Sequence, residues 1–255
     1  MVETIILGIH GLGGHSGWFK NLENDLEKQG IDFYAFDLPG FGTNHNLVSQ
    51  SSYIKGHVDS YKEWISCAQA EYHKLREKNP EAEIIVLGHS LGALIAANMT
   101  EIDQGTKLIL SVPGFKGSPS TFNQSFFWST LRKVVIDKLI LQRDVYVKLP
   151  SSAKKSTPAD TDPLRISEVT QTMLLEIMKL RAASKKRMTE IEAPVFMIQI
   201  ADDKVVDNPT QQEHFDLIKA DGKLFKVYED TDHDWIWSMT CCQQVTADIV
   251  DWLAS

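Results

Sequence analysis

The sequence has little cysteine, no long apolar run and no excess of positive charge. Three cysteines in 255 residues, two of them adjacent, are too few for a disulfide framework and indicate a reducing compartment. No uninterrupted apolar stretch approaches the roughly 20 residues that cross a bilayer. A net charge of −8 argues against nucleic-acid binding by the whole protein. The first residues also lack the basic and apolar segments of a signal peptide, so we expect a soluble, cytoplasmic protein.

What is present is the composition of an ordinary globular protein. Hydrophobic residues make up 43% and charged residues 24% of the chain, which excludes disordered and collagen-like classes. A length of 255 residues fits one domain with room for an insertion.

Short apolar runs alternate with helical patterns in the first and last parts of the chain. Strands are expected at 4–9, 31–36, 84–87, 107–112, 195–200 and 224–227. Helices are expected at 18–28, 58–75, 91–99, 211–218 and 245–253. Strands separated by helices predict a parallel sheet with helices on both faces.

Between residues 113 and 190 this alternation stops. Helical patterns cover 126–141 and 164–180, and no comparable strand pattern separates them. We therefore predict a mostly helical insertion at 113–190, set into an α/β core formed by 1–112 and 191–255.

The predicted insertion also differs from the core in charge. It contains 14 Lys and Arg against 7 Asp and Glu, although the whole chain is acidic. Such a basic insertion would suit an anionic membrane surface or an acidic substrate. The simpler interpretation is a solvated, Lys-rich helical surface.

A serine nucleophile is predicted where the strand at 84–87 turns into the helix at 91–99. The turn reads Gly88-His89-Ser90-Leu91-Gly92, and G-x-S-x-G between a strand and a helix is typical of a nucleophile on a strained backbone. Glycines on both sides relieve the crowding between strand and helix. The helix N-terminus favours developing negative charge. This context favours a nucleophile over a serine in an ordinary tight turn.

A serine nucleophile needs a base, and the base needs an orienting acid. In doubly wound hydrolases the acid and then the base follow the nucleophile, each in a loop after a strand. Of the eight histidines, only His233 has both this chain order and this position. Asp203 is the preferred acid, and Asp202 and Asp207 in the same loop are the alternatives.

A glycine-rich turn, His10-Gly11-Leu12-Gly13-Gly14, closes the first strand. Its glycines let the backbone approach a bound carbonyl, so the N–H of Leu12 can join that of Leu91 in holding an oxyanion. A phosphate-binding P-loop is excluded because no G-K-[ST] follows, and a dinucleotide site because G-x-G-x-x-G is missing. We therefore expect neither a cofactor nor a metal.

Six segments carry a family resemblance: HGLGGHS (10–16), FDLPGFG (36–42), GHSLG (88–92), DPL (162–164), ADDKVVD (201–207) and YEDTDHDW (228–235). With them the sequence resembles the α/β-hydrolase fold superfamily, and within it the monoacylglycerol lipase and lysophospholipase-like serine esterases. The resemblance implies an α/β-hydrolase fold with a helical cap. The sequence departs from the family in starting directly with the strand before the His-Gly turn, so we expect a reduced, mostly parallel sheet of about six strands, with the usual N-terminal strand pair missing.

The resemblance further implies the site. Ser90, Asp203 and His233 would form the catalytic triad, and Leu12 and Leu91 would donate to the oxyanion. The residues expected to contact the substrate are Gly11, His89, Phe126, Trp128, Met173 and Val206. The apolar cap residues among them, which would form an acyl pocket, could equally pack the cap onto the core.

The implied activity is that of a serine carboxylesterase. It would hydrolyse lipid-like esters, such as monoacylglycerols or lysophospholipids, through an acyl-enzyme. Its partner would be a small-molecule ester with an acyl chain. The alternatives are a small-ester, thioester or carbon–carbon bond hydrolase on the same triad, and a ligand-binding protein with little turnover.

Overall fold

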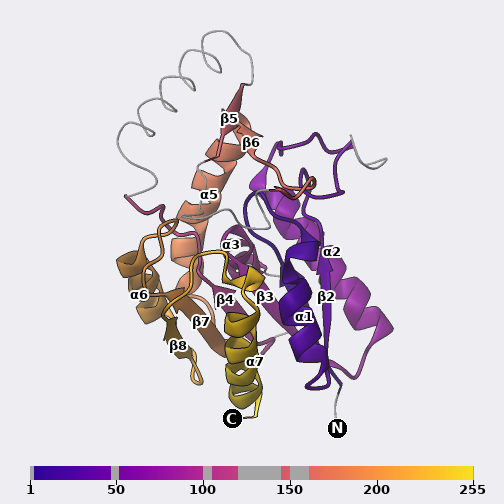
Figure 1. The fold of residues 1–255 in the computed structure, drawn as a ribbon, viewed down its shortest axis with the longest axis vertical. Helices are drawn as coiled ribbons and strands as arrows, with labels where there is room; N and C mark the ends of the chain where they lie inside the picture. The colour runs from indigo at the N-terminus through magenta and orange to yellow at the C-terminus, as the bar shows by residue number, and fades with distance from the viewer. Residues whose placement is uncertain (1–2, 47–51, 100–104, 120–144, 150–160, 255) are drawn as a thin grey trace.

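The computed structural model describes residues 3–46, 52–99, 105–119, 145–149 and 161–254. Its centre is a six-stranded sheet in which every strand pairing is parallel, with helices on both faces (Figure 1). The strand order is β2-β1-β3-β4-β7-β8. The predicted α/β-hydrolase architecture, with a reduced parallel sheet of about six strands, is confirmed.

The strands of this sheet are β1 (Thr4–Ile9), β2 (Ile31–Phe36), β3 (Glu83–His89), β4 (Leu108–Ser111), β7 (Val195–Ile200) and β8 (Leu224–Tyr228). The helices are α1 (Lys20–Glu27), α2 (Tyr61–Lys78), α3 (Leu91–Asn98), α5 (Gln171–Met188), α6 (Asn208–Leu217) and α7 (Met239–Leu253), and 3₁₀ turns cover Ser16–Phe19 and Trp235–Trp237. These bounds follow the predicted ones within a few residues in most elements. Val58, expected on the second helix, lies before it, because Ser60 forms a capping box with Glu63.

The order of the strands creates a crevice at the carboxyl end of the sheet. β1 pairs with both β2 and β3, so the chain leaves β1 toward one edge and β3 toward the other. Where the strand order reverses in this way, the loops after the two central strands diverge and leave room for a ligand. The glycine-rich turn and the Ser90 turn follow β1 and β3 respectively.

Two apolar clusters enclose the sheet. On one face, side chains of α2, α3 and α5 pack together, including Trp64, Leu94 and Leu180. On the other face, α1 and α7 contribute Leu22 and Ile249. The central strands are apolar on both faces because both faces are covered.

The described part of the predicted insertion is not purely helical. A short antiparallel pair, β5 (Tyr146–Lys148) with β6 (Glu168–Thr170), precedes α5. The predicted helix at 164–180 was therefore wrong over its first residues: helix α5 begins at Gln171, because the Thr170 hydroxyl accepts a hydrogen bond from the N–H of Met173 and caps it. The predicted helix at 126–141 lies outside the described residues.

Helix α5 packs as part of the layer that covers the sheet. It shares an apolar cluster with α3, to which it contributes Met173, Leu180 and Met188. The division into a core of 1–112 and 191–255 and a cap of 113–190 stays a prediction.

Within the described ranges, no helix combines the length and the apolar character that crossing a membrane requires.

Candidate active site

Ser90 lies on a sharp turn between β3 and α3. Its backbone has φ 55° and ψ −108°, a conformation that a non-glycine residue adopts only under strain. The turn closes tightly around it. A Cβ on Gly92 would lie 2.0 Å from the Ile9 carbonyl oxygen, and one on Gly88 would lie 2.3 Å from the Gly92 carbonyl oxygen. Both glycines are therefore required by packing, as expected for a nucleophile elbow.

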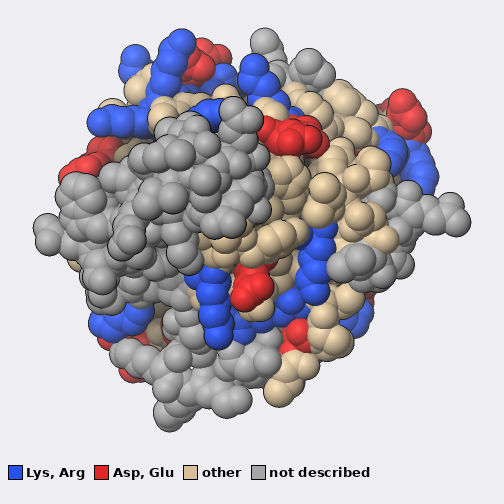
Figure 2. All heavy atoms as spheres, turned by 90° about the horizontal axis from the view of Figure 1, so that it is seen from above, with Lys and Arg blue, Asp and Glu red and all other residues tan. Residues whose placement is uncertain are grey.

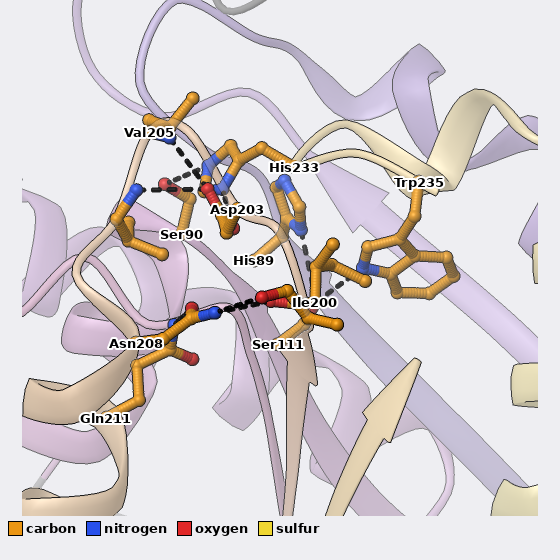
Figure 3. A network of polar contacts seen from close by, with 12 residues as sticks. His89, Ser90, Ser111, Ile200, Asp203, Val205, Asn208, Gln211, His233 and Trp235 are labelled. Atoms are coloured by element: carbon orange, nitrogen blue, oxygen red, sulfur yellow. Dashed lines mark hydrogen bonds and ion pairs between the residues drawn. The ribbon is translucent and has the colours of Figure 1, made fainter. Parts of the chain in front are cut away.

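Three side chains from separate loops meet at this turn (Figure 3). The Ser90 Oγ lies 2.9 Å from Nε2 of His233, and Nδ1 of His233 lies 2.8 Å from Oδ2 of Asp203. A carboxylate only accepts hydrogen bonds, so Nδ1 carries the proton and Nε2 is left to accept from the serine hydroxyl. His233 and Asp203 are both buried. The arrangement can take a proton from Ser90.

Burial and charge act on the imidazole in opposite directions. Burial lowers the pKa of His233, but the Asp203 carboxylate, its hydrogen bond and the charges of Asp234 and Asp232 outweigh burial and raise the pKa above 6.5. For Asp203 burial acts in the other direction and raises the pKa. The charge of His233, its hydrogen bond and two backbone N–H groups outweigh burial, so the pKa of Asp203 is lowered overall. The pair therefore favours a charged carboxylate beside a basic imidazole.

The backbone around Asp203 holds its carboxylate in place. Oδ1 accepts hydrogen bonds from the N–H groups of Val205 at 2.7 Å and Val206 at 3.0 Å. The same loop pairs with the segment after β4: Ser118 N–H donates to the Val205 carbonyl at 2.8 Å, and Gly117 forms a bridge with Val206. Asp203 is thus fixed on both sides.

The two alternative acids have other contacts. Asp202 is exposed and pairs with Lys204. Asp207 caps α6 by accepting a hydrogen bond from the N–H of Thr210 at 3.3 Å. Neither is placed against His233, so among the three aspartates the structure brings only Asp203 to the imidazole.

The end of β7 is also tied down. The Asn208 side-chain amide donates to the carbonyls of Ile200 and Ala201, both at 2.8 Å, and accepts from Gln211 at 3.1 Å (Figure 3). Gln211 is buried beneath this contact. The acid loop therefore starts from a fixed strand end.

The glycine-rich turn closes directly over Ser90. A Cβ on Gly11 would lie 3.1 Å from the Cβ of Ser90, so a larger residue would crowd the serine. The next amide is that of Leu12, and Leu91 is the first residue of α3. Neither amide donates to any of the turn, loop or cap hydrogen bonds within the described ranges. Both predicted oxyanion donors thus lie in turns that flank Ser90.

His10 holds this turn from below, a role that the sequence did not suggest. Its Nδ1–H donates to the Gly11 carbonyl at 2.8 Å, and its Nε2 accepts from the N–H of Leu38 at 3.0 Å. Burial lowers the pKa of His10 to about 4, so the ring is neutral and can accept at one nitrogen while donating at the other.

A pocket opens beside Ser90. Its walls are formed by Gly11, Leu12, Trp18, His89, Ser90, Leu91, Leu94, Gly114, Leu149, Arg165, Ile166, Ile177, Arg181, Val205, Val206, His233 and Asp234. Three of the residues expected to contact substrate, Gly11, His89 and Val206, are among them. Met173 is not: it is fully buried in the core, and Ile177, one helical turn later, faces the pocket instead. Phe126 and Trp128 lie outside the described residues.

His89 lies behind His233. Its ring centroid is 5.3 Å from that of His233, and its Nδ1 lies 3.2 Å from the Ser111 Oγ, which also accepts from Trp235 at 2.9 Å (Figure 3). Burial, with the neighbouring histidines, keeps the pKa of His89 well below 6.5. The ring is therefore neutral.

His89, His233 and Asp234 form the one group of possible metal ligands in the part of the chain that the structure describes. Both ring nitrogens of His233 are engaged with Ser90 and Asp203, so the imidazole has no lone pair left for an ion. The geometry fits proton transfer rather than metal binding.

The Asp-Pro-Leu segment at 162–164 is tied to the glycine-rich turn. Asp162 Oδ2 accepts from His15 at 2.6 Å and from the Trp18 indole at 3.1 Å. The N–H of Ile166 donates to the Gly13 carbonyl at 2.9 Å. These contacts fix the chain before β6 against the turn that contains Leu12.

The chain matches one family over residues 2–237, described as serine aminopeptidase, S33. It is 25% identical over 237 residues to phospholipase YtpA of Bacillus subtilis, covering 91% of this chain and 88% of that protein. It is 24% identical over 243 residues to human monoglyceride lipase, covering 91% and 75% respectively.

Solved structures share the fold. A soluble variant of monoglyceride lipase from Saccharomyces cerevisiae, in complex with a substrate analogue, superposes with a TM-score of 0.80 at 18% identity, over 99% of this chain and 86% of that one. The monoacylglycerol lipase of Paleococcus ferrophilus gives 0.74 at 21% identity, over 99% and 96%.

Proposed function

We propose that this chain, which belongs to the α/β-hydrolase family described as serine aminopeptidase, S33, is a serine carboxylesterase that hydrolyses lipid-like esters. The observation that carries this proposal is the unbroken hydrogen-bonded series from Asp203 through His233 to Ser90. Relatives named phospholipase and monoglyceride lipase, matched over 91% of this chain, support an ester with an acyl chain.

The reaction would proceed in two halves. In the first, the Ser90 Oγ attacks the ester carbonyl while its proton passes to Nε2 of His233, which then gives that proton to the departing alcohol. In the second, His233 takes a proton from water, the hydroxide attacks the acyl-enzyme, and the proton returns to Ser90 as the acid leaves. Asp203 keeps the ring in the correct tautomer and stabilises its charged form.

The amides of Leu12 and Leu91 would hold the negative charge on the carbonyl oxygen. Both belong to turns that are packed against Ser90, so little reorganisation is needed when the charge develops. The N-terminus of α3 adds its dipole in the same place.

The described part of the pocket is partly apolar, with Leu94, Leu149 and Ile177 in its walls, which suits an acyl chain. Phe126 and Trp128 stay predicted members of this acyl pocket. Replacing Trp128 by alanine should change the preferred acyl length, and an unchanged chain-length profile would argue against its membership.

The deciding experiment is a series of p-nitrophenyl esters from acetate to palmitate, assayed with the wild type and Ser90→Ala. We expect turnover that peaks at a medium or long acyl chain and falls at least about 10⁴-fold in the variant. An optimum at acetate would favour the small-ester alternative. An aminoacyl p-nitroanilide tests the peptidase named in the family description, and faster cleavage of it than of any ester would overturn the proposal.

Location and membrane contact are further parts of the proposal. Cys67, Cys241 and Cys242 are all unpaired, which suits a reducing cytoplasm. Figure 2 shows Lys and Arg side chains interspersed with Asp and Glu on the described part of the upper face. Peripheral contact through the basic segment at 113–190 should give binding to anionic liposomes that weakens with salt. Salt-independent binding, or none, would contradict it.

A further inference from the structure

Two arginines line the pocket that contains Ser90, and neither takes part in the proposed triad. Arg181 comes from the middle of α5, and Arg165 from the segment just before β6. A neutral monoacylglycerol offers no group that needs a cation. A negatively charged substrate would explain why two guanidinium groups lie beside Ser90.

Arg181 is anchored at one end of its guanidinium. Its Nε–H donates to the Gly114 carbonyl at 2.7 Å, and the N–H of Gly114 donates to the Ser90 carbonyl at 3.1 Å. Through Gly114 the arginine is thus held one residue from the nucleophile turn. The side chain is half-buried, so its ordered guanidinium stands in a partly desolvated wall. The two terminal nitrogens of a guanidinium can each donate a hydrogen bond to a different oxygen of the same carboxylate or phosphate.

No carboxylate among the described residues neutralises Arg181. It forms no ion pair there, and burial alone lowers its pKa, without an acidic neighbour to oppose that effect. The carboxylate that shares the pocket, Asp234, acts on His233, whose pKa it raises. A partly buried cation without an anionic partner lowers the stability of the folded protein, and a ligand that supplies the opposite charge offsets this loss.

We infer that this pocket selects esters that carry a negatively charged group close to the scissile carbonyl, and that Arg181 binds that group with Arg165 beside it. The inference rests on the proposed esterase function and narrows its substrate class from lipid-like esters in general to anionic ones. A carboxylate and a phosphate both match the guanidinium fork, and the experiment below distinguishes them.

The kinetic test compares esters that differ only in charge. In the first series the octanoyl ester of glycerol is the neutral reference, the ester of glyceric acid adds a carboxylate to the alcohol part, and the ester of glycerol 3-phosphate adds a phosphate there. In the second series mono-octyl succinate carries a carboxylate on the acyl part, and octyl butyrate is its neutral counterpart. We expect kcat/KM at least about 10-fold higher for one anionic ester than for its neutral counterpart. The preferred ester identifies the anion. Equal or lower values for every anionic ester would overturn the inference.

Arg181→Met keeps the length of the side chain and removes its charge. It should abolish the preference by lowering kcat/KM for the anionic ester about 10- to 100-fold, mostly through KM, with a much smaller effect on the neutral one. An equal loss on both esters would show that Arg181 only supports Gly114, and would overturn the inference. Arg181→Lys, which retains the charge, should restore part of the preference.

Arg187→Met is the matched control. Arg187 belongs to the same helix and its Nε–H also donates to a backbone carbonyl, that of Ala97 at 3.2 Å, but its terminal nitrogen pairs with Glu190 and it lies outside the pocket walls. This variant should keep the wild-type ratio between anionic and neutral esters. A reduced ratio would mean that any lost arginine has this effect, and would contradict a site at Arg181.

A binding measurement separates this inference from the esterase proposal. Ethers are not hydrolysed, so calorimetry with 1-O-octylglycerol and its 3-phosphate on the Ser90→Ala protein reports charge recognition without turnover. The phosphate should bind at least about 10-fold more tightly, and the difference should disappear with Arg181→Met. If all esters fail as substrates but this difference persists, the esterase proposal fails and the anion site stands. Equal binding of the two ethers would overturn the anion site for phosphate.

Discussion

The two walls of the pocket beside Ser90 are built in different ways. The core wall is made from turns that end β1, β3 and β7, and their backbone conformation is dictated by close packing around Ser90 and by hydrogen bonds to Asp203. The opposite wall consists of side chains from α5 and the segment before it, such as Ile177 and Arg181. In the proposed mechanism the main chain of the core wall therefore positions the reacting groups, and side chains of the opposite wall contact the substrate.

The largest effect should come from disturbing the core wall at Gly92. Gly92→Ala puts a Cβ 2.0 Å from the Ile9 carbonyl oxygen, so we expect a protein that fails to fold or loses more than about 4 kcal/mol of stability. Gly222→Ala is the control: its φ is +75° but its nearest neighbour would be 3.8 Å away, and it should cost about 1 kcal/mol. Thermal melts that place both variants at the same Tm would refute the packing argument.

The next effect is chemical. Asp203→Asn should lower kcat about 10⁴-fold, because the amide no longer fixes the His233 tautomer or stabilises its charge. The base acts when neutral, so wild-type activity should rise with pH through a His233 pKa above 6.5, and the residual activity of the variant should rise at lower pH. The exposed Asp202→Asn is the control and should stay within a few-fold of wild type. A pH profile that does not move in Asp203→Asn would assign the acid role elsewhere.

Neighbouring positions on α5 separate packing from substrate contact. Met173→Ala should destabilise the protein by about 2 to 5 kcal/mol and leave the preferred acyl length unchanged, because its side chain is fully buried in the core. Ile177→Ala should shift the preference toward longer acyl chains, since it enlarges the pocket. A shifted chain-length optimum in Met173→Ala, at an unchanged Tm, would restore the original assignment of Met173 to the acyl pocket.

The smallest effect is expected where the two walls meet. Asp162→Asn weakens the contacts to His15 and Trp18, so we expect a loss of about 1 to 2 kcal/mol and a higher KM with a similar kcat. Burial raises the pKa of Asp162, but hydrogen bonds led by that of His15 lower it below 3.8 overall. Its stabilising contribution is thus present above pH 3.8 and lost as the pH falls through the lower, folded-state pKa. The Tm gap between variant and wild type should close there, and a gap independent of pH would contradict this.

The sequence predicted the core wall better than the opposite one, for a physical reason. The turn at Ser90 is encoded locally, because a strand, two glycines and a helix allow one backbone path. Helix α5 is buried on several sides, with Gln171, Met173, Glu176 and Ser184 all inaccessible, so its pattern has no clear polar face. The pattern therefore does not show which side of the helix faces the pocket, and the structure places Ile177 rather than Met173 there. The support from His10 also depends on Leu38, 28 residues away.

The pairing of residues 116–118 with the acid loop has a consequence for how such a protein can be altered. Gly117 and Ser118 bind the main chain beside Asp203, so the supports of this carboxylate reach across to the segment after β4. A change in that segment would therefore reach the proposed triad through the Asp203 loop. The position of the proposed acid thus depends on a part of the chain that leaves the sheet far earlier in the sequence.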